Sequence, residues 1–112
     1  MTPDAPRVGL FVAEKAADGP SQVAPEIAAL VPAYLASKRK QLADAQARLA
    51  ARDLSPVQRF GHNLKGTGRG YGFPELEQIG REIEAAAKLS DEISISLQLE
   101  SLRRFLSHTE TN

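Results

Sequence analysis

Apolar residues recur at helical spacing in four segments of the chain, and this periodicity limits the fold more than any other feature. Three of these segments begin at a proline, at Pro32, Pro56 and Pro74, and proline is well tolerated in a first helical turn. The fourth segment follows Ser90-Asp91-Glu92, which offers capping side chains. Amphipathic helices are stable when their apolar stripes are buried against one another. The sequence therefore predicts an all-α protein.

An antiparallel four-helix bundle is the most economical way to pack four such helices joined by short turns. We expect a loosely structured N-terminal leader over residues 1–24, the bundle over residues 25–108, and a C-terminal tail over residues 109–112. Within the bundle, a short turn over residues 25–31 leads into the four helices. Their expected limits are a start near Pro32, then Ser55 to about Gly68–Tyr71, a third start at Phe73-Pro74-Glu75, and a last helix ending near Ser107.

The stretch 93–99 is the one place where the periodicity is ambiguous. Its apolar residues alternate with polar ones, as they would in a strand. Over a longer window a helical spacing fits better, and with no partner strand in the sequence we predict a helix. The residues at that spacing are Ile95, Leu99, Leu102 and Leu106.

The first long helix carries a small basic cluster, Lys38-Arg39-Lys40. We interpret this cluster as a solvated face, with a contribution to partner docking as the alternative. The expected inner face of this helix consists of Ile27, Val31, Tyr34, Gln41 or Leu42, Ala45 and Leu49.

Length and composition bound the class of protein. With 112 residues the chain suits one domain. Its 14 basic and 14 acidic residues give a net charge of zero, which argues against a general nucleic-acid binder. The chain has no cysteine, which excludes disulfides and thiol chemistry. The apolar stretch 8–13 is too short for a signal sequence or a membrane span. We therefore predict a cytoplasmic protein with neither a nucleic-acid partner nor a membrane partner.

His62 lies on the side of the predicted second helix that faces away from the apolar stripe. At about 100° per residue its imidazole should point to solvent. Lys65 and Arg69 follow on the same face, and Gly66 lies one turn beyond the histidine. The stripe itself consists of Val57, Phe60, Leu64 and Tyr71. An uncovered imidazole beside two cations is suited to receive a phosphoryl group.

Accepting a phosphoryl group requires a neutral imidazole, because the ring nitrogen attacks phosphorus through its lone pair. An imidazole of ordinary acidity is largely neutral at pH 7. Neighbouring cations would favour the neutral form before transfer and screen the phosphoryl charge afterwards.

Glycines are unusually frequent in the predicted second helix. Gly61, Gly66 and Gly68 should each weaken a helix by about 0.8–1 kcal/mol relative to alanine, so something must require them. Close helix packing would explain Gly68, and Gly80 in the next helix suggests a close crossing. We expect Gly61 and Gly66 to clear space around the imidazole of His62 for another protein.

The run His62-Asn63-Leu64-Lys65-Gly66 resembles the core motif of the histidine-containing phosphotransfer (HPt) domain family. That family carries His-x-Leu-Lys-Gly on the second helix of a four-helix bundle. Thr67 stands where the family has serine or threonine, and Gly72 stands at a downstream glycine of the family. The resemblance covers roughly residues 25–107. It departs from the family at Gly68-Arg69-Gly70, where many members have serine, alanine or asparagine.

The resemblance implies a phosphorelay carrier. His62, through Nε2, would accept a phosphoryl group from a receiver-domain aspartate and pass it to another receiver. Lys65 would stabilise the phosphoryl oxygens, Gly66 would give steric access, and Arg69 would add charge. The implied partners are response-regulator receiver domains and a hybrid histidine kinase. The receiver would bring Mg²⁺, so that this chain needs no cofactor or metal of its own.

Other functions compete with this interpretation. The absence of a Gly-x4-Gly-Lys-Ser/Thr motif argues against an autonomous kinase. The run 69–73 matches the start of an RNA-binding RNP1 signature, but Pro74 and the lack of strand periodicity oppose it. Alternating glycines from Gly66 to Gly72 lack the spacing of a nucleotide loop. The serious alternative is a phosphate-independent helical module that binds a receiver or another signalling partner.

Overall fold

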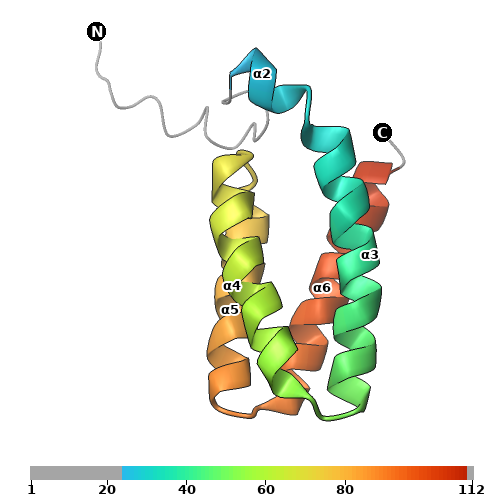
Figure 1. Cartoon of the computed structure of the whole chain (residues 1–112), viewed down its shortest axis with the longest axis vertical. Helices are drawn as coiled ribbons and strands as arrows, with labels where there is room; N and C mark the ends of the chain where they lie inside the picture. Colours follow the sequence, from blue (N-terminus) through green and yellow to red (C-terminus); the bar gives the residue numbers. More distant parts are fainter. Residues whose placement is uncertain (1–23, 111–112) are drawn as a thin grey trace, which may run out of the picture.

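The computed structural model describes residues 24–110, and the predicted leader over residues 1–24 therefore lies almost entirely outside the described part of the chain. The described residues form five helices and no strand, which confirms the all-α class (Figure 1). The helices are α2 Pro25–Ala28, α3 Val31–Ala50, α4 Leu54–Gly70, α5 Pro74–Lys88 and α6 Glu92–Glu110.

The four long helices form an antiparallel bundle (Figure 1). Each of them packs against two neighbours, because α4 and α6 both contact α3 as well as α5. The short helix α2 sits at the end of the bundle where α3 begins (Figure 1), as the predicted turn over residues 25–31 implies. The core combines leucine, isoleucine, valine and alanine with Tyr34, Phe60 and Phe73. Its largest fully buried side chains are Leu64, Leu76, Ile83, Ile95, Leu102 and Val57.

The structure resolves the ambiguous stretch in favour of a helix. Ile95 and Leu99 are buried, whereas Ile93 and Leu97 are 76% and 62% exposed. Apolar residues two apart therefore lie on different sides of α6, as a period of 3.6 requires. The helix continues to Glu110 instead of ending near Ser107, so that part of the predicted C-terminal tail is helical.

The predicted cap of α4 is wrong, whereas that of α6 is confirmed. The helix α4 begins at Leu54, which packs against the core, so that Asp53 is the N-cap and Ser55 lies inside the first turn. Pro56 remains acceptable there, because the first-turn N–H groups have no partner within the helix. At α6, Oδ1 of Asp91 accepts a hydrogen bond from the backbone N–H of Ser94 at 3.1 Å.

The basic cluster on α3 is only partly a solvated face, because Lys40 is exposed whereas Lys38 and Arg39 turn inward. Lys38 is only 5% exposed, its Nζ atom donates to Oε1 of Gln41 at 2.8 Å, and the same atom lies 5.2 Å from the ring centroid of Tyr34. Burial lowers the pKa of Lys38. Arg39 also turns inward, donating to the carbonyl oxygen of Leu106 on α6 at 3.2 Å. These contacts let long cationic side chains cover apolar surface between helices.

Candidate functional site

His62 projects from the side of α4 that faces away from the bundle. The residues of α4 that are buried lie on the opposite and lateral sides, and they are Val57, Phe60, Gly61, Leu64 and Gly68. The side chain of His62 is 65% exposed, as its helical phase predicts. An incoming group can therefore approach the ring from solvent.

A carboxylate on α5 holds both His62 and Lys65. Oε2 of Glu84 lies 3.0 Å from Nδ1 of His62, and Oε1 of the same carboxylate lies 2.8 Å from Nζ of Lys65. The side chain of Glu84 is only 12% exposed, and Nζ of Lys88 lies 3.8 Å from Oε2. The hydrogen bond from Lys65, helped by that from His62 and by the positive charges of Lys65 and Lys88, lowers the pKa of Glu84. The carboxylate is therefore ionised at neutral pH.

This carboxylate selects one tautomer of the neutral imidazole. An ionised carboxylate can only accept hydrogen bonds, so Nδ1 of His62 must donate to Glu84. The proton of the neutral ring then sits on Nδ1, and the lone pair sits on Nε2. The nitrogen that remains for nucleophilic attack is Nε2.

Glycines bring the backbones of α4 and α5 close together at this point. A Cβ atom on Gly61 would lie 2.6 Å from the backbone nitrogen of Glu84, and one on Gly80 would collide with the backbone of Lys65. Gly61 is buried, so our prediction that it clears space around the imidazole is wrong. Its absent side chain instead lets α5 approach until Glu84 reaches His62 and Lys65. The crossing predicted from Gly80 is confirmed.

Gly68 is required by the packing of the bundle, whereas Gly66 is not. A Cβ atom on Gly68 would lie 2.8 Å from Cβ of Leu76, which confirms close packing as the reason for this glycine. A Cβ atom on Gly66 would meet nothing within 4 Å. The packing of the bundle therefore does not require Gly66, and the surface one turn beyond His62 is open.

Arg69 lies outside the cluster formed by His62, Lys65 and Glu84. It is exposed in the last turn of α4, about 10 Å along the helix axis from His62 at 1.5 Å per residue. No ion pair joins Arg69 to another residue in the described range 24–110. Of the two cations predicted to flank the imidazole, the structure brings Lys65 to the carboxylate and leaves Arg69 apart.

Thr67 ties the helix that carries His62 to α3. Its hydroxyl donates to the carbonyl oxygen of Asn63 at 2.8 Å, so the hydroxyl of Tyr34 must donate to Thr67 Oγ1, also at 2.8 Å. The ring of Tyr34 stacks on that of Tyr71 with a centroid distance of 4.1 Å, and burial is the main reason that the pKa of Tyr34 is raised. These contacts fix the C-terminal half of α4, on which Lys65 and Gly66 lie.

Sequence reasoning missed Glu84, because its role depends on which helices pair and at what height. Gly61 and Gly80 were the available signal. Had these two glycines been paired across the helix crossing, Glu84 would have been placed beside His62, since it lies one turn beyond Gly80. A shallow hollow of about 320 Å³ next to the imidazole is lined by His62, Glu84, Gln58, Arg59 and Asn63. A place in the site for Gln58, Arg59 or Asn63 was not predicted from the sequence either.

Comparison with known protein families agrees with this geometry. A family model described as the Hpt domain matches residues 29–111, which is most of the chain. The chain belongs to the Hpt domain family. The match includes all the helices that surround His62 in this Hpt domain, and it supports a histidine phosphotransfer role in two-component signalling. No curated protein and no solved structure matched the chain.

Two further searches of the described residues gave negative results. Within residues 24–110, no group of three or more histidine, aspartate or glutamate side chains could hold a metal ion. In the same part of this Hpt domain, no helix combines the length and the apolar character that crossing a membrane demands.

Proposed function

We propose that this Hpt domain is a phosphorelay carrier in which His62 accepts a phosphoryl group from a receiver aspartate and passes it to a second receiver. The observation that carries the proposal is the exposed imidazole whose Nδ1 atom is bonded to Glu84. That bond leaves Nε2 as the nucleophile. The family match supports the same role.

The transfer step balances without an added acid or base. The lone pair of Nε2 attacks phosphorus, the N–P bond forms, and the O–P bond to the receiver aspartate breaks, which leaves that aspartate as a free carboxylate. The proton on Nδ1 stays in place, so the phosphorylated ring carries a positive charge. Glu84 accepts the hydrogen bond from this ring and offsets its charge. Transfer to the second receiver reverses each of these changes.

Lys65 and Gly66 serve the phosphoryl group in this proposal. Lys65 lies within one turn of His62 and is bound to Glu84 at rest, so that a short swing of its flexible stem takes Nζ to a phosphoryl oxygen. Gly66 leaves room for the receiver surface. Arg69 adds a more distant positive charge. Positioning and charge neutralisation dominate phosphoryl transfer.

We assign the remaining requirements to the partner. The receiver brings the aspartate and the Mg²⁺, which neutralises charge on the phosphoryl oxygens during transfer. A hybrid histidine kinase that contains such a receiver is the proposed phosphoryl donor. The alternative is a helical module that binds a receiver and carries no phosphate, because docking and transfer use one surface.

Incubation with a phosphorylated receiver distinguishes these two functions. The carrier should acquire label that is labile in acid and stable in base, and His62→Gln should abolish the labelling. The chain has two histidines, so His108→Gln is the matched control and should label normally. Binding of the receiver without any label on the wild-type chain would favour the alternative.

A further inference from the structure

The helix that carries His62 has basic residues and no acidic ones. α4 contains Arg59, Lys65 and Arg69, and the sequence has no aspartate or glutamate from residue 54 to residue 74. The chain as a whole has as many acidic as basic residues, so this excess of positive charge is local. A partner with an acidic surface would therefore be attracted to the exposed side of α4.

The cations on α4 differ in how their charge is neutralised. Nζ of Lys65 lies 2.8 Å from Oε1 of Glu84, so that a carboxylate pairs its charge. Arg59 is exposed, and its Nη1 atom donates to the hydroxyl oxygen of Ser55 at 3.1 Å. That hydroxyl is neutral, and no carboxylate within residues 24–110 forms an ion pair with Arg59. The charge of Arg59 is therefore available to another molecule.

Arg59 is the arginine of α4 that lies beside the imidazole. Residues three apart on a helix are neighbours on its surface, and the side chains of Arg59 and His62 line the same hollow of about 320 Å³. Arg59 is about 4.5 Å from His62 along the helix axis, whereas Arg69 is about 10 Å away and does not line this hollow. A molecule that binds at His62 therefore meets Arg59 first.

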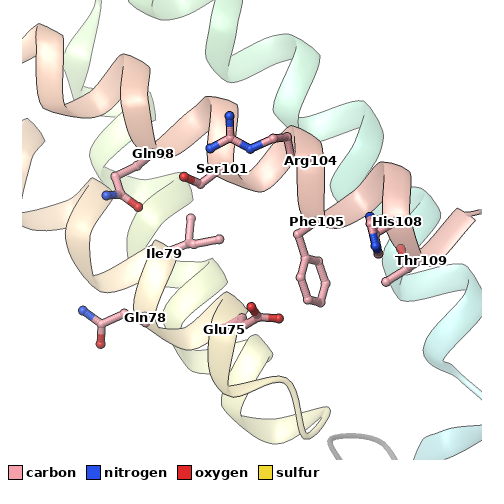
Figure 2. A pocket seen from close by; sticks show the side chains of 9 residues that line it. All are labelled: Glu75, Gln78, Ile79, Gln98, Ser101, Arg104, Phe105, His108 and Thr109. Atoms are coloured by element: carbon pink, nitrogen blue, oxygen red, sulfur yellow. The ribbon is translucent and has the colours of Figure 1, made fainter.

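A larger hollow lies elsewhere on the bundle. This groove of about 620 Å³ runs between α5 and α6 and is lined by no residue of α4. Figure 2 shows that Glu75 from α5 and Arg104 from α6 both line the groove, so that its charges are mixed. The groove and the hollow beside His62 share no lining residue. A receiver that exchanges a phosphoryl group with His62 must contact α4, and the groove supplies control residues away from that contact.

We propose that Arg59 binds a carboxylate of the receiver at the edge of its phosphoryl site, an inference that rests on the proposed phosphorelay function. A receiver that brings Mg²⁺ needs acidic side chains to hold the ion, and a phosphoryl group on its aspartate adds negative charge. The planar guanidinium of arginine offers paired donors that match a carboxylate. Arg59 therefore docks and orients the receiver, while His62 and Lys65 act on the phosphoryl group itself.

Affinity for a receiver that carries no phosphate tests this contact apart from the transfer step. The probe is the Mg²⁺-loaded receiver domain that binds the chain most tightly among those encoded in the same genome, and calorimetry measures the Kd. Arg59→Ala should raise the Kd about tenfold at low salt, because a charge-assisted contact is lost. The difference should shrink at about 0.5 M salt. Arg104→Ala removes an exposed arginine from α6 and should leave the Kd unchanged.

Arg59→Lys tests whether the paired donors of the guanidinium matter. Lysine keeps the positive charge but cannot bind a carboxylate through two parallel hydrogen bonds. The Kd of this variant should therefore lie between those of the wild type and Arg59→Ala. Circular dichroism and urea unfolding check that each variant is folded.

Double-mutant cycles identify the partner group on the receiver. Each acidic residue that borders the receiver's phosphorylated aspartate is replaced in turn by its amide. One replacement should weaken binding to the wild-type chain and have little further effect on binding to Arg59→Ala. A Kd for Arg59→Ala equal to that of the wild type, or the absence of any coupled acid, overturns the proposal.

The same measurements separate this contact from the phosphorelay function. If the wild-type chain binds the receiver but never becomes labelled, the phosphorelay function is wrong, and the Kd values still decide whether Arg59 makes the contact. If no receiver binds the chain, both proposals are overturned.

Discussion

Nδ1 of His62 lies 3.0 Å from Oε2 of Glu84, so a histidine on α4 takes its tautomer from a carboxylate on α5. The same carboxylate binds Nζ of Lys65 at 2.8 Å. A single acidic residue therefore orients the proposed nucleophile and holds the cation that is proposed to receive the phosphoryl charge. This coupling makes Glu84 the first residue to test.

Replacing Glu84 should slow phosphoryl acceptance without removing it. Glu84→Ala removes a hydrogen bond to a charged group, which is worth about 1.5–3 kcal/mol, so we expect a rate about 10–100-fold lower. Glu84→Gln keeps an acceptor for Nδ1 and should be partly active. The measurement is the rate of labelling by a phosphorylated receiver.

Nitrogen NMR of His62 separates orientation from a general structural effect. In the wild-type protein the Nδ1-protonated tautomer should dominate the neutral ring, and in Glu84→Ala the two tautomers should mix. An unchanged tautomer ratio in a slowed, folded variant would refute the positioning role.

Removing the cation at Lys65 should also reduce transfer. Lys65→Ala should slow labelling by about tenfold, because one charge-assisted contact to the phosphoryl group is lost. Arg69→Ala is the matched control and should have a smaller effect, since Arg69 lies outside the cluster around Glu84. Equal rates for Lys65→Ala and wild type would transfer the electrostatic role to Arg69 or to the receiver.

Local signals in the sequence were sufficient for most of the fold. Prolines near helix starts and the spacing of core residues such as Leu64 and Leu102 locate the helices, because both depend only on neighbours along the chain. Asp53 replaced Ser55 as the N-cap, since packing Leu54 against the core extended the helix by two residues. The error is small because the core, not the cap, fixes that end.

The misjudged residues depend on contacts between helices. Helical phase placed Gly61 beside His62 but could not show that α5 covers that side of α4. Lys38 was expected in solvent. Its partners Tyr34 and Gln41 lie one turn away on α3, but the sequence does not show that this side of α3 is buried in the bundle. Glu84 was missed for the same reason.

Enlarging Gly66 should block transfer and spare the fold. In Gly66→Leu the new side chain begins in open space, and leucine is the better helix former by up to about 1 kcal/mol. The domain should stay folded while labelling falls at least about tenfold, because the receiver can no longer approach. The measurements are labelling rate and urea unfolding.

Gly61→Leu is the contrasting variant. Its Cβ atom would meet the backbone of α5 at 2.6 Å, so this variant should lose stability. If Gly66→Leu labels at the wild-type rate, steric access is not the role of Gly66.

Truncating Leu64 should destabilise the bundle. Its side chain is fully buried beneath the site, and Leu→Ala changes in cores cost about 2–5 kcal/mol. Urea unfolding measures this loss. Leu97→Ala, at an exposed position of α6, should change the free energy of unfolding by no more than about 0.5 kcal/mol at low protein concentration. A cost well under about 1 kcal/mol for Leu64→Ala would contradict the orientation of α4.

The ion pairs of Glu84 should make part of the stability of the domain dependent on pH. Its pKa in the folded protein is below the ordinary value of 4.5, chiefly because Lys65 donates a hydrogen bond to it. The unfolded chain then binds more protons than the folded one as the pH falls below that value, so stability decreases. This contribution is complete above the ordinary pKa and is lost as the pH falls through the lowered one. Between about pH 6 and about pH 3, the free energy of unfolding measured in urea should therefore fall less in Glu84→Gln than in wild type. The control variant Glu26→Gln, on α2, should lose as much free energy of unfolding between these two pH values as wild type. If Glu84→Gln also loses as much as wild type, the ion pairs of Glu84 do not stabilise the fold.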